Sequence, residues 1–518
     1  RLQPEHGDAW RTYLQGADAA GDRRAALEAL QRLSVIDPGD QSIQLRRILA
    51  EIGQRSTVEE RVAAFTSLLD PDRRARLPRP MASRLAVELA ILLDRAGDRD
   101  GMLEWLKEAI AIDPFNSIAA EMAVIELAPG APAERVTELL VARCLSNPAN
   151  LAWLEQLAVY ALEHGAYEAA YRLLDLTVAC HGGVRQAPSA LVVDRALATW
   201  ALGRTDEALT LLDMRARAAQ DLFNELTDSI EYYDSTLRAT LSPSQIEAGD
   251  RERAARMQAR ADVIRAIVDL ESIRLLVLAG AERDTELEQA ANALAAASRR
   301  LSQDVGMVMP GDRAAMAAPL RDAAEIIFFA GGPADLAEAL LAESLSQAPA
   351  PERQSARMSG WRALRDGRPE DARAAFEPGA DSDPGSALGL AMVEREGGDQ
   401  RRAAMLLLRV ARAEPARARS VCALDRLVAL LGARAPLSTD AAAIDSVVAT
   451  MPRTFDRLVS DPGRSLLLRV STPTDTVSSG DAIYLDVEIT NRSGLPLALA
   501  PGGPIMPDVA VPFTITSV

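Results

Sequence analysis

The sequence predicts a mainly α-helical protein, a superhelical solenoid of antiparallel helix pairs followed by a small, incomplete β-sandwich module. Three observations support this fold class. Of the 518 residues, 48% are hydrophobic but only 4% are aromatic, which favours closely packed helices over one large core. Glycines and prolines recur in phase along most of the chain, and near the C-terminus apolar and polar residues begin to alternate.

The helix pairs are predicted from six glycines that share one pattern. Each glycine is followed five and nine residues later by a small or apolar residue, and positions four apart lie on one stripe of a helix. Glycine permits a tight turn before that helix, and an Asp-Pro step ends it because proline disfavours helical geometry in the preceding residue. The glycines and their apolar pairs are Gly21 (Ala26, Leu30), Gly53 (Val58, Val62), Gly97 (Met102, Leu106), Gly203 (Ala208, Leu212), Gly367 (Ala372, Phe376) and Gly398 (Ala403, Leu407).

The length of the unit comes from the prolines. Pro4 and Pro38 are 34 residues apart, as are Pro114 and Pro148. Because Pro4 lies one period before Pro38, we expect the array to begin before residue 1.

A period near 34 built from helix pairs resembles the tetratricopeptide repeat family. Trp10, Ala26, Leu30 and Pro38 fall at the family's tryptophan, alanine, phenylalanine and proline positions, and Tyr160 falls at its tyrosine position in a later repeat. The resemblance implies units that stack into an elongated superhelix, since no repeat buries its apolar face alone.

The domain organisation follows from where the repeat keeps its phase. We expect repeats over residues 1–216 and 331–435, with longer, irregular helices over 217–330 that continue the solenoid. Residues 436–462 are predicted to be a linker, and residues 463–518 a partial β module.

The C-terminal module resembles the first strands of an immunoglobulin-like sandwich. A complete sandwich needs about seven strands, so we expect the natural chain to continue beyond residue 518. Such modules occur in bacterial envelope proteins, and we therefore favour the cell envelope, outside the cytoplasm, over the cytoplasm. The expected strands are Leu466–Ser471, Ile483–Thr490, Leu495–Leu499 and Phe513–Val518.

Charge and composition exclude several classes of protein. A net charge of −17 argues against a nucleic-acid-binding protein, which would need a basic face. No apolar run is long enough to span a membrane. Lys107 is the only lysine among the basic residues, which we interpret as the codon bias of a GC-rich bacterial genome.

No catalytic, cofactor or metal site can be recognised, so we expect a protein that is not an enzyme. The three histidines do not have metal-binding spacing. Cys180-His181 is best interpreted as an exposed turn at the end of a repeat. Gly331-Gly332 precedes a helix but lacks the lysine and hydroxyl of a nucleotide-binding loop, so it also indicates a turn.

The family resemblance implies a partner-binding surface on the first helix of each pair, which lines the concave face. Trp200 and Trp361 are the most interesting candidates because exposed tryptophans are frequent binding anchors, although either could instead pack between helices. The lysine and asparagine clamp of chaperone-binding members is absent. The inner positions carried over from the family are Arg11, Gln15, Asp18, Ile43, Arg47, Val193, Leu197, Trp200, Trp361 and Leu364.

We therefore expect a bacterial, non-catalytic scaffold that binds other proteins or peptides along the solenoid, with homo-oligomers possible. Two alternatives stay open. In the first, the chain is the helical part of a larger enzyme, and in the second it is a structural envelope protein that assembles with itself.

Overall fold

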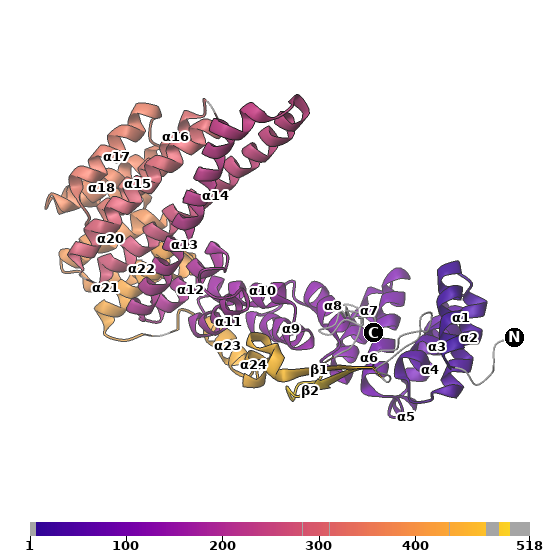
Figure 1. Cartoon of the computed structure of the whole chain (residues 1–518). Coiled ribbons are helices and arrows are strands. Elements are labelled where there is room, and N and C mark those ends of the chain that lie inside the picture. Colours follow the sequence, from indigo (N-terminus) through magenta and orange to yellow (C-terminus); the bar gives the residue numbers. More distant parts are fainter. Residues whose placement is uncertain (1–6, 282, 310, 435, 473–485, 498–518) are drawn as a thin grey trace. The chain divides into compact units, whose positions relative to one another are not determined.

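The structure, a computed structural model, describes residues 7–281, 283–309, 311–434, 436–472 and 486–497. Within these residues the chain forms 25 α-helices and two β-strands (Figure 1), so the predicted mainly α-helical fold of paired helices is confirmed. Two compact units can be distinguished. The first comprises Arg1–Trp153 and Met451–Val518, and the second comprises Leu154–Thr450.

The first unit consists of consecutive helix pairs and one short sheet. Its helices are α1 (Gly7–Ala20), α2 (Arg23–Ile36), α3 (Gln41–Gly53), α4 (Val58–Leu69), α5 (Pro71–Arg74), α6 (Arg79–Arg95), α7 (Arg99–Ile112), α8 (Ser117–Leu127), α9 (Ala133–Ser146), α24 (Arg453–Ser460) and α25 (Pro462–Ser465). Helix α1 packs against α2, α6 against α7, and α8 against α9.

Asp-Pro and similar steps separate the pairs of the first unit, as predicted. Helix α2 ends before Asp37-Pro38, and Asp40 then caps the next helix by accepting hydrogen bonds from two backbone N–H groups at its start. Asn116 caps α8 in the same way, after Asp113-Pro114. The same short segment therefore ends one helix and begins the next.

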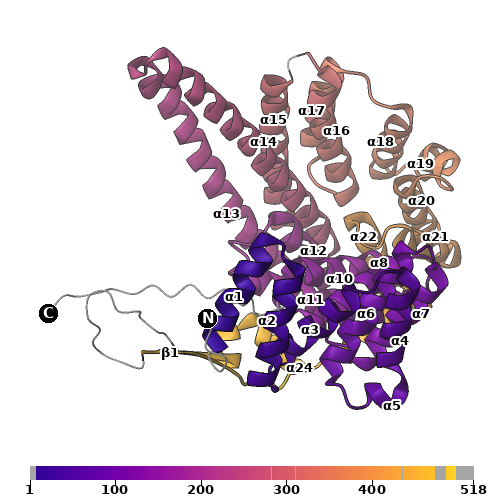
Figure 2. The same cartoon turned by 90° about the vertical axis from the view of Figure 1, so that its right-hand side faces the viewer.

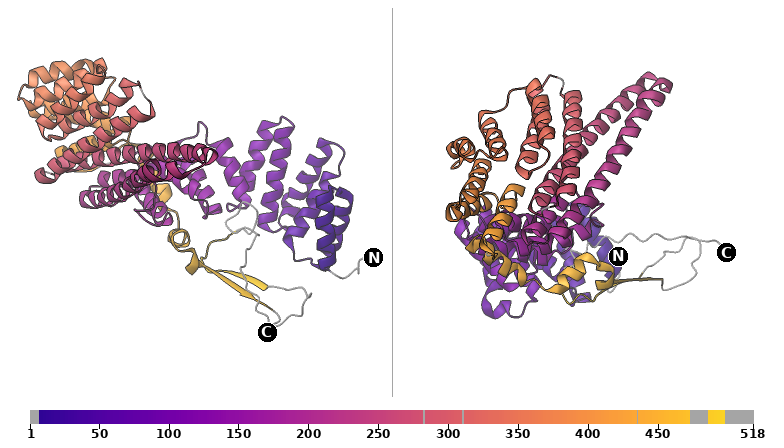
Figure 3. Two further views of the ribbon diagram at one scale, coloured as in Figure 1. Left: turned by 45° about the horizontal axis from the view of Figure 1, so that its top comes forward. Right: turned by 90° about the vertical axis from the view of Figure 1, so that its left-hand side faces the viewer.

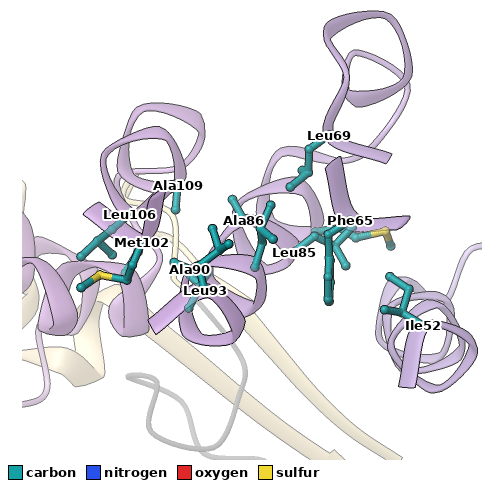
Figure 4. Close-up of a cluster of buried hydrophobic side chains, with 14 residues drawn as sticks. Ile52, Phe65, Leu69, Leu85, Ala86, Ala90, Leu93, Met102, Leu106 and Ala109 are labelled. Carbon is teal, nitrogen blue, oxygen red and sulfur yellow. The ribbon is translucent and has the colours of Figure 1, made fainter. Parts of the chain in front are cut away.

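The core of the first unit lies between neighbouring helices (Figure 4). Leu85 of α6 and Leu106 of α7 are fully buried, and they pack in one cluster with Phe65 of α4 and Met102 of α7. A second cluster joins α1, α2 and α3 around Trp10. Each cluster is shared by adjacent helices, as expected for a repeat that cannot bury its apolar face alone.

Five of the six turn glycines are confirmed. Gly21, Gly97, Gly203, Gly367 and Gly398 all have positive φ, the conformation that glycine adopts without strain.

Gly53 is the exception, and of the apolar pair predicted after it only Val62 packs against the core. Gly53 is the last residue of α3, and α4 begins with a capping box between Thr57 and Glu60. Val58 is the first residue of α4 and is exposed, whereas Val62, Phe65 and Leu69 follow on the same side of the helix and pack into the core. The cause is local, since a helix that starts from a side-chain cap needs no glycine turn.

The second unit continues the helix pairs. Its helices are α10 (Leu151–Glu163), which begins at the end of the first unit, α11 (Tyr167–Cys180), α12 (Ser189–Ala201), α13 (Thr205–Tyr232), α14 (Pro243–Gly280), α15 (Asp284–Val308), α16 (Arg313–Ala330), α17 (Ala334–Gln347), α18 (Glu352–Arg365), α19 (Pro369–Phe376), α20 (Pro384–Glu396), α21 (Gln400–Ala413), α22 (Ala418–Leu431) and α23 (Thr439–Ala449). The pairs from α12 onward are α12 with α13, α14 with α15, α16 with α17, α18 with α19, and α20 with α21.

Helices are longest where the repeat loses its phase. Helix α13 has 28 residues, α14 has 38 and α15 has 25, whereas most others have about 11 to 14. Figure 2 shows α13 and α14 extending beside each other. A π-helical turn and a 3₁₀ turn, Tyr233–Leu237 and Arg238–Thr240, connect them. Residues 217–330 thus contain long, irregular helices.

The C-terminal part contains helices that the sequence did not predict. Helices α23 and α24 lie within residues 436–462, which were expected to be a linker. They were missed because these short helices lie outside the phase of the repeat.

Strands β1 (Leu466–Ser471) and β2 (Asp486–Asn491) pair antiparallel, with Leu468 opposite Ile489 (Figure 3, yellow arrows). Residues 495–497 are not in a strand, and the fourth expected strand lies outside the described residues. The immunoglobulin-like sandwich therefore stays a prediction.

Candidate functional site

The first helices of the pairs in the second unit form a ring. Along the chain, α12 contacts α14, α14 contacts α16, α16 contacts α18, α18 contacts α20, and α20 contacts α22. Helix α22 in turn contacts both α12 and α14. The inner helices of this unit therefore enclose a common space.

Contacts between the two ends of the unit hold the ring closed. The Tyr167 hydroxyl donates a hydrogen bond of 3.0 Å to the carbonyl of Pro415, and the backbone N–H of Ala169 donates one of 2.8 Å to a carboxylate oxygen of Asp445. These partners lie 248 and 276 residues apart. No repeat pattern predicts such pairs, because the pattern describes only neighbouring units.

The ring encloses a groove of about 1240 Å³ that every inner helix lines. We call this the central groove. Because side chains from all six inner helices reach it, the groove is a product of the whole ring. Its apolar side chains include Val193 and Leu197 of α12, Ile273 and Leu276 of α14, Phe329 of α16 and Leu388 of α20.

The central groove also holds a buried ion cluster around Glu325 of α16. This side chain is only 3% exposed. Arg357 of α18 donates two hydrogen bonds to it, of 2.7 and 3.0 Å, and Arg419 of α22 donates a longer one of 3.3 Å. Gln354 connects Glu325 to Asp322. Three inner helices are thereby joined by charge-assisted hydrogen bonds.

Three other carboxylates line the groove without an ion pair among the described residues. They are Asp194 of α12, Asp269 of α14 and Asp322 of α16. Asp269 and Asp322 are exposed to the groove, but the helices around them displace much of the bulk water. This desolvation raises the pKa of all three carboxyls, and that of Asp194 to about 6.

The residues predicted to bind a partner lie in different surroundings. Val193, Leu197 and Trp361 line the central groove. Arg11 and Gln15 are exposed on α1, in the first unit.

The remaining predicted positions of the first unit make contacts within that unit. Arg47 forms an ion pair of 2.7 Å with Glu51, one turn later in α3. Asp18 pairs with Arg46 at 2.7 Å, and Ile43 is buried in the core around Trp10.

The two tryptophans are not exposed anchors. Trp200 is 1% exposed and does not line the groove, while Trp361 is 4% exposed and packs edge-on between Phe329 and Phe376. They are buried because the inner helices are covered on more than one side, by the next inner helix and by the outer layer. The alternative that they pack between helices is correct.

The cysteines do not have the environment of a nucleophile. Burial raises the pKa of the Cys144 thiol to about 12 and also raises the pKa of Cys180 and Cys422. An activated cysteine needs the opposite shift. Cys180 ends α11, and the neighbouring His181 lies 2.9 Å from Glu155 of α10, which fits the predicted turn at the end of a repeat.

Gly331-Gly332 is also a turn. Gly331 has a left-handed conformation that ends α16, and the side chain of Arg365 donates a hydrogen bond to the carbonyl of Gly332.

The described residues contain neither a cluster of metal ligands nor a membrane-spanning helix. No three His, Cys, Asp or Glu side chains among them could together hold a metal ion. None of the helices they form has the length and apolar character needed to cross a membrane.

Comparison with known proteins gives only remote likenesses. No protein-family model matches the chain, and no curated protein matches its sequence. Similar solved structures include Naa15/Naa10 bound to HypK-THB, with 12% identity over 88% of each chain and a TM-score of 0.24. A circular tandem repeat protein has 15% identity over 82% of this chain and 90% of that one, with a TM-score of 0.22.

The APC/C hetero-tetramer Cut9-Hcn1 has 14% identity over 88% of this chain and 94% of that one, with a TM-score of 0.25. TM-scores this low do not establish a common fold, so the assignment of function has to rest on the chain's own residues.

Proposed function

We propose that the protein is a non-catalytic interaction scaffold that binds a segment of another protein in the central groove. The observation that carries this proposal is the groove itself. It is concave and combines apolar side chains from every inner helix with charged and hydroxyl side chains, so that it offers both an apolar surface and polar groups that can orient a ligand.

The size of the groove favours a polypeptide segment over a small molecule. Its volume of about 1240 Å³ exceeds that of pockets for small ligands, which are roughly 300–1,000 Å³.

We also propose that the protein lies outside the cytoplasm, where the β module displays or anchors the helical part. The observed pairing of β1 with β2 is the feature on which this part depends.

The test uses one substitution at two positions. Ala318 lines the groove on α16, and Ala339 lies exposed on α17, an outer helix. Ala318→Trp would fill part of the groove, whereas Ala339→Trp adds the same bulk elsewhere.

Each immobilised variant is exposed to a lysate of the native cell, and the retained proteins are identified by mass spectrometry. We expect a partner that is retained by the wild type and by Ala339→Trp but lost from Ala318→Trp. Equal retention by both variants would show that the groove is not the binding surface. Circular dichroism of each variant checks that the substitution leaves the helices intact.

A further inference from the structure

We infer that the segment bound in the central groove is basic, with lysine or arginine side chains between apolar ones. This inference rests on the proposed function and adds the chemistry of the partner. It follows from the charges that line the groove and from which of them are already neutralised.

Every arginine that lines the groove is already paired. The pairs are Arg265 with Asp262 at 3.1 Å, Arg357 with Glu325 at 2.7 Å, Arg417 with Glu414 at 3.8 Å, and Arg419 with Glu325 at 3.3 Å. The cations of the groove are therefore committed to carboxylates of the protein itself.

The carboxylates without an ion pair in the described residues are Asp194, Asp269 and Asp322. They come from three successive inner helices, α12, α14 and α16, and they line the same cavity. With Asp262, Glu325 and Glu414 the groove is lined by six carboxylates against four arginines, so its lining is net negative and favours a partner that supplies cations.

The surroundings of these carboxylates exclude an acidic segment. Their raised pKa values reflect desolvation, which disfavours the ionised carboxylates; a nearby cation would stabilise the ionised form, and a further anion would destabilise it. For Asp194 the charge of Glu163 adds to the desolvation, and only Arg417 opposes it. An acidic partner would bring like charges together where solvent screens them poorly.

Apolar side chains line the rest of the groove. Val193, Leu197, Ile273, Leu276 and Phe329 come from the same three helices as the carboxylates. A segment that alternates basic and apolar side chains can therefore satisfy both kinds of surface at once.

The experiment selects binders from a library of short randomised peptides displayed on phage, with the full chain immobilised. The groove variant is Asp194→Asn/Asp269→Asn/Asp322→Asn. The control is Glu288→Gln/Asp335→Asn/Glu396→Gln, which replaces three exposed carboxylates that do not line the groove and changes the net charge equally. This control shows whether a basic peptide binds in the groove or is only attracted by the overall negative charge of the protein.

We expect the selected peptides to be enriched in lysine, arginine and apolar residues. Their affinity should fall by roughly tenfold or more in the groove variant and change by less than about twofold in the control. If the enriched peptides are acidic or uncharged but fail to bind the Ala318→Trp variant, the inference of a basic partner is wrong. The proposed function, binding in the groove, would still hold in that case. Peptides that bind Ala318→Trp as well as wild type, or no enrichment at all, would overturn both.

Discussion

The Tyr167 hydroxyl lies 3.0 Å from the carbonyl oxygen of Pro415, and this hydrogen bond joins the start of the second unit to its end, 248 residues later. The bond is buried, and Asp445 accepts a further hydrogen bond from Ala169 beside it. Together these contacts close the ring of inner helices whose walls form the central groove.

Tyr167→Phe should destabilise the second unit by about 1–3 kcal/mol, because the buried carbonyl of Pro415 loses its donor. Urea denaturation measures the change. Tyr232→Phe is the control, since Tyr232 is exposed at the end of α13 and should tolerate the substitution. Equal losses in the two variants would show that the bond to Pro415 does not stabilise the ring.

The register of the helix pairs is tested in the first unit. Leu106→Ala should cost roughly 2–5 kcal/mol, since Leu106 is fully buried between α6 and α7. Val58→Ala should cost less than about 0.5 kcal/mol because Val58 is 39% exposed. Similar losses at both positions, measured by chemical denaturation, would contradict the observed packing of α4.

Two glycines with open space around them separate backbone strain from packing. Gly97→Ala should destabilise the protein by roughly 1–2 kcal/mol, because Gly97 has a φ of +82°. Gly53→Ala should be neutral or slightly stabilising, since Gly53 lies at the end of α3 without positive φ. If Gly97→Ala stabilised the protein and Gly53→Ala destabilised it, the turns would be assigned to the wrong residues. Thermal unfolding of both variants provides the comparison.

The stability of the second unit should depend on pH through Asp194. Desolvation raises its pKa in the folded chain to about 6, above the value of about 3.9 expected in the unfolded chain. The folded state therefore holds this proton more tightly, so the carboxyl contributes stability below about pH 4 that is lost as the pH rises through about 6.

The measurement for Asp194 is the free energy of unfolding as a function of pH for wild type and Asp194→Asn. Between about pH 4 and 7 the wild type should lose stability relative to the variant, which has no proton to release. Parallel curves across this range would show that the carboxyl is not desolvated in the folded chain.

Local order was predictable because its causes are local. Asp37-Pro38 ends one helix and Asp40 starts the next within four residues, and the phase of such signals gives the helix pairs. Gly53 failed as a turn because the capping box of Thr57 and Glu60 provides another way to begin a helix, which the glycine phase does not detect.

The groove could be predicted only in part. Val193 and Leu197 follow from their place on the first helix of a pair, but Asp194, Asp269 and Asp322 carry no signal that brings them together. Their grouping depends on the closure of the ring, which joins residues hundreds of positions apart. The burial of Trp200 could not be predicted either, since α12 is apolar on most sides and its sequence does not tell which side faces the groove.

The most direct measurement of the central claim places a photoreactive benzophenone side chain at position 318 in the groove or at position 339 on the outer layer. Each protein is irradiated with the partner retained by the wild type, and the cross-linked residues are identified by mass spectrometry. Binding in the central groove predicts cross-links from position 318 to one segment of the partner and none from position 339. Cross-links from position 339 with none from position 318 would contradict it.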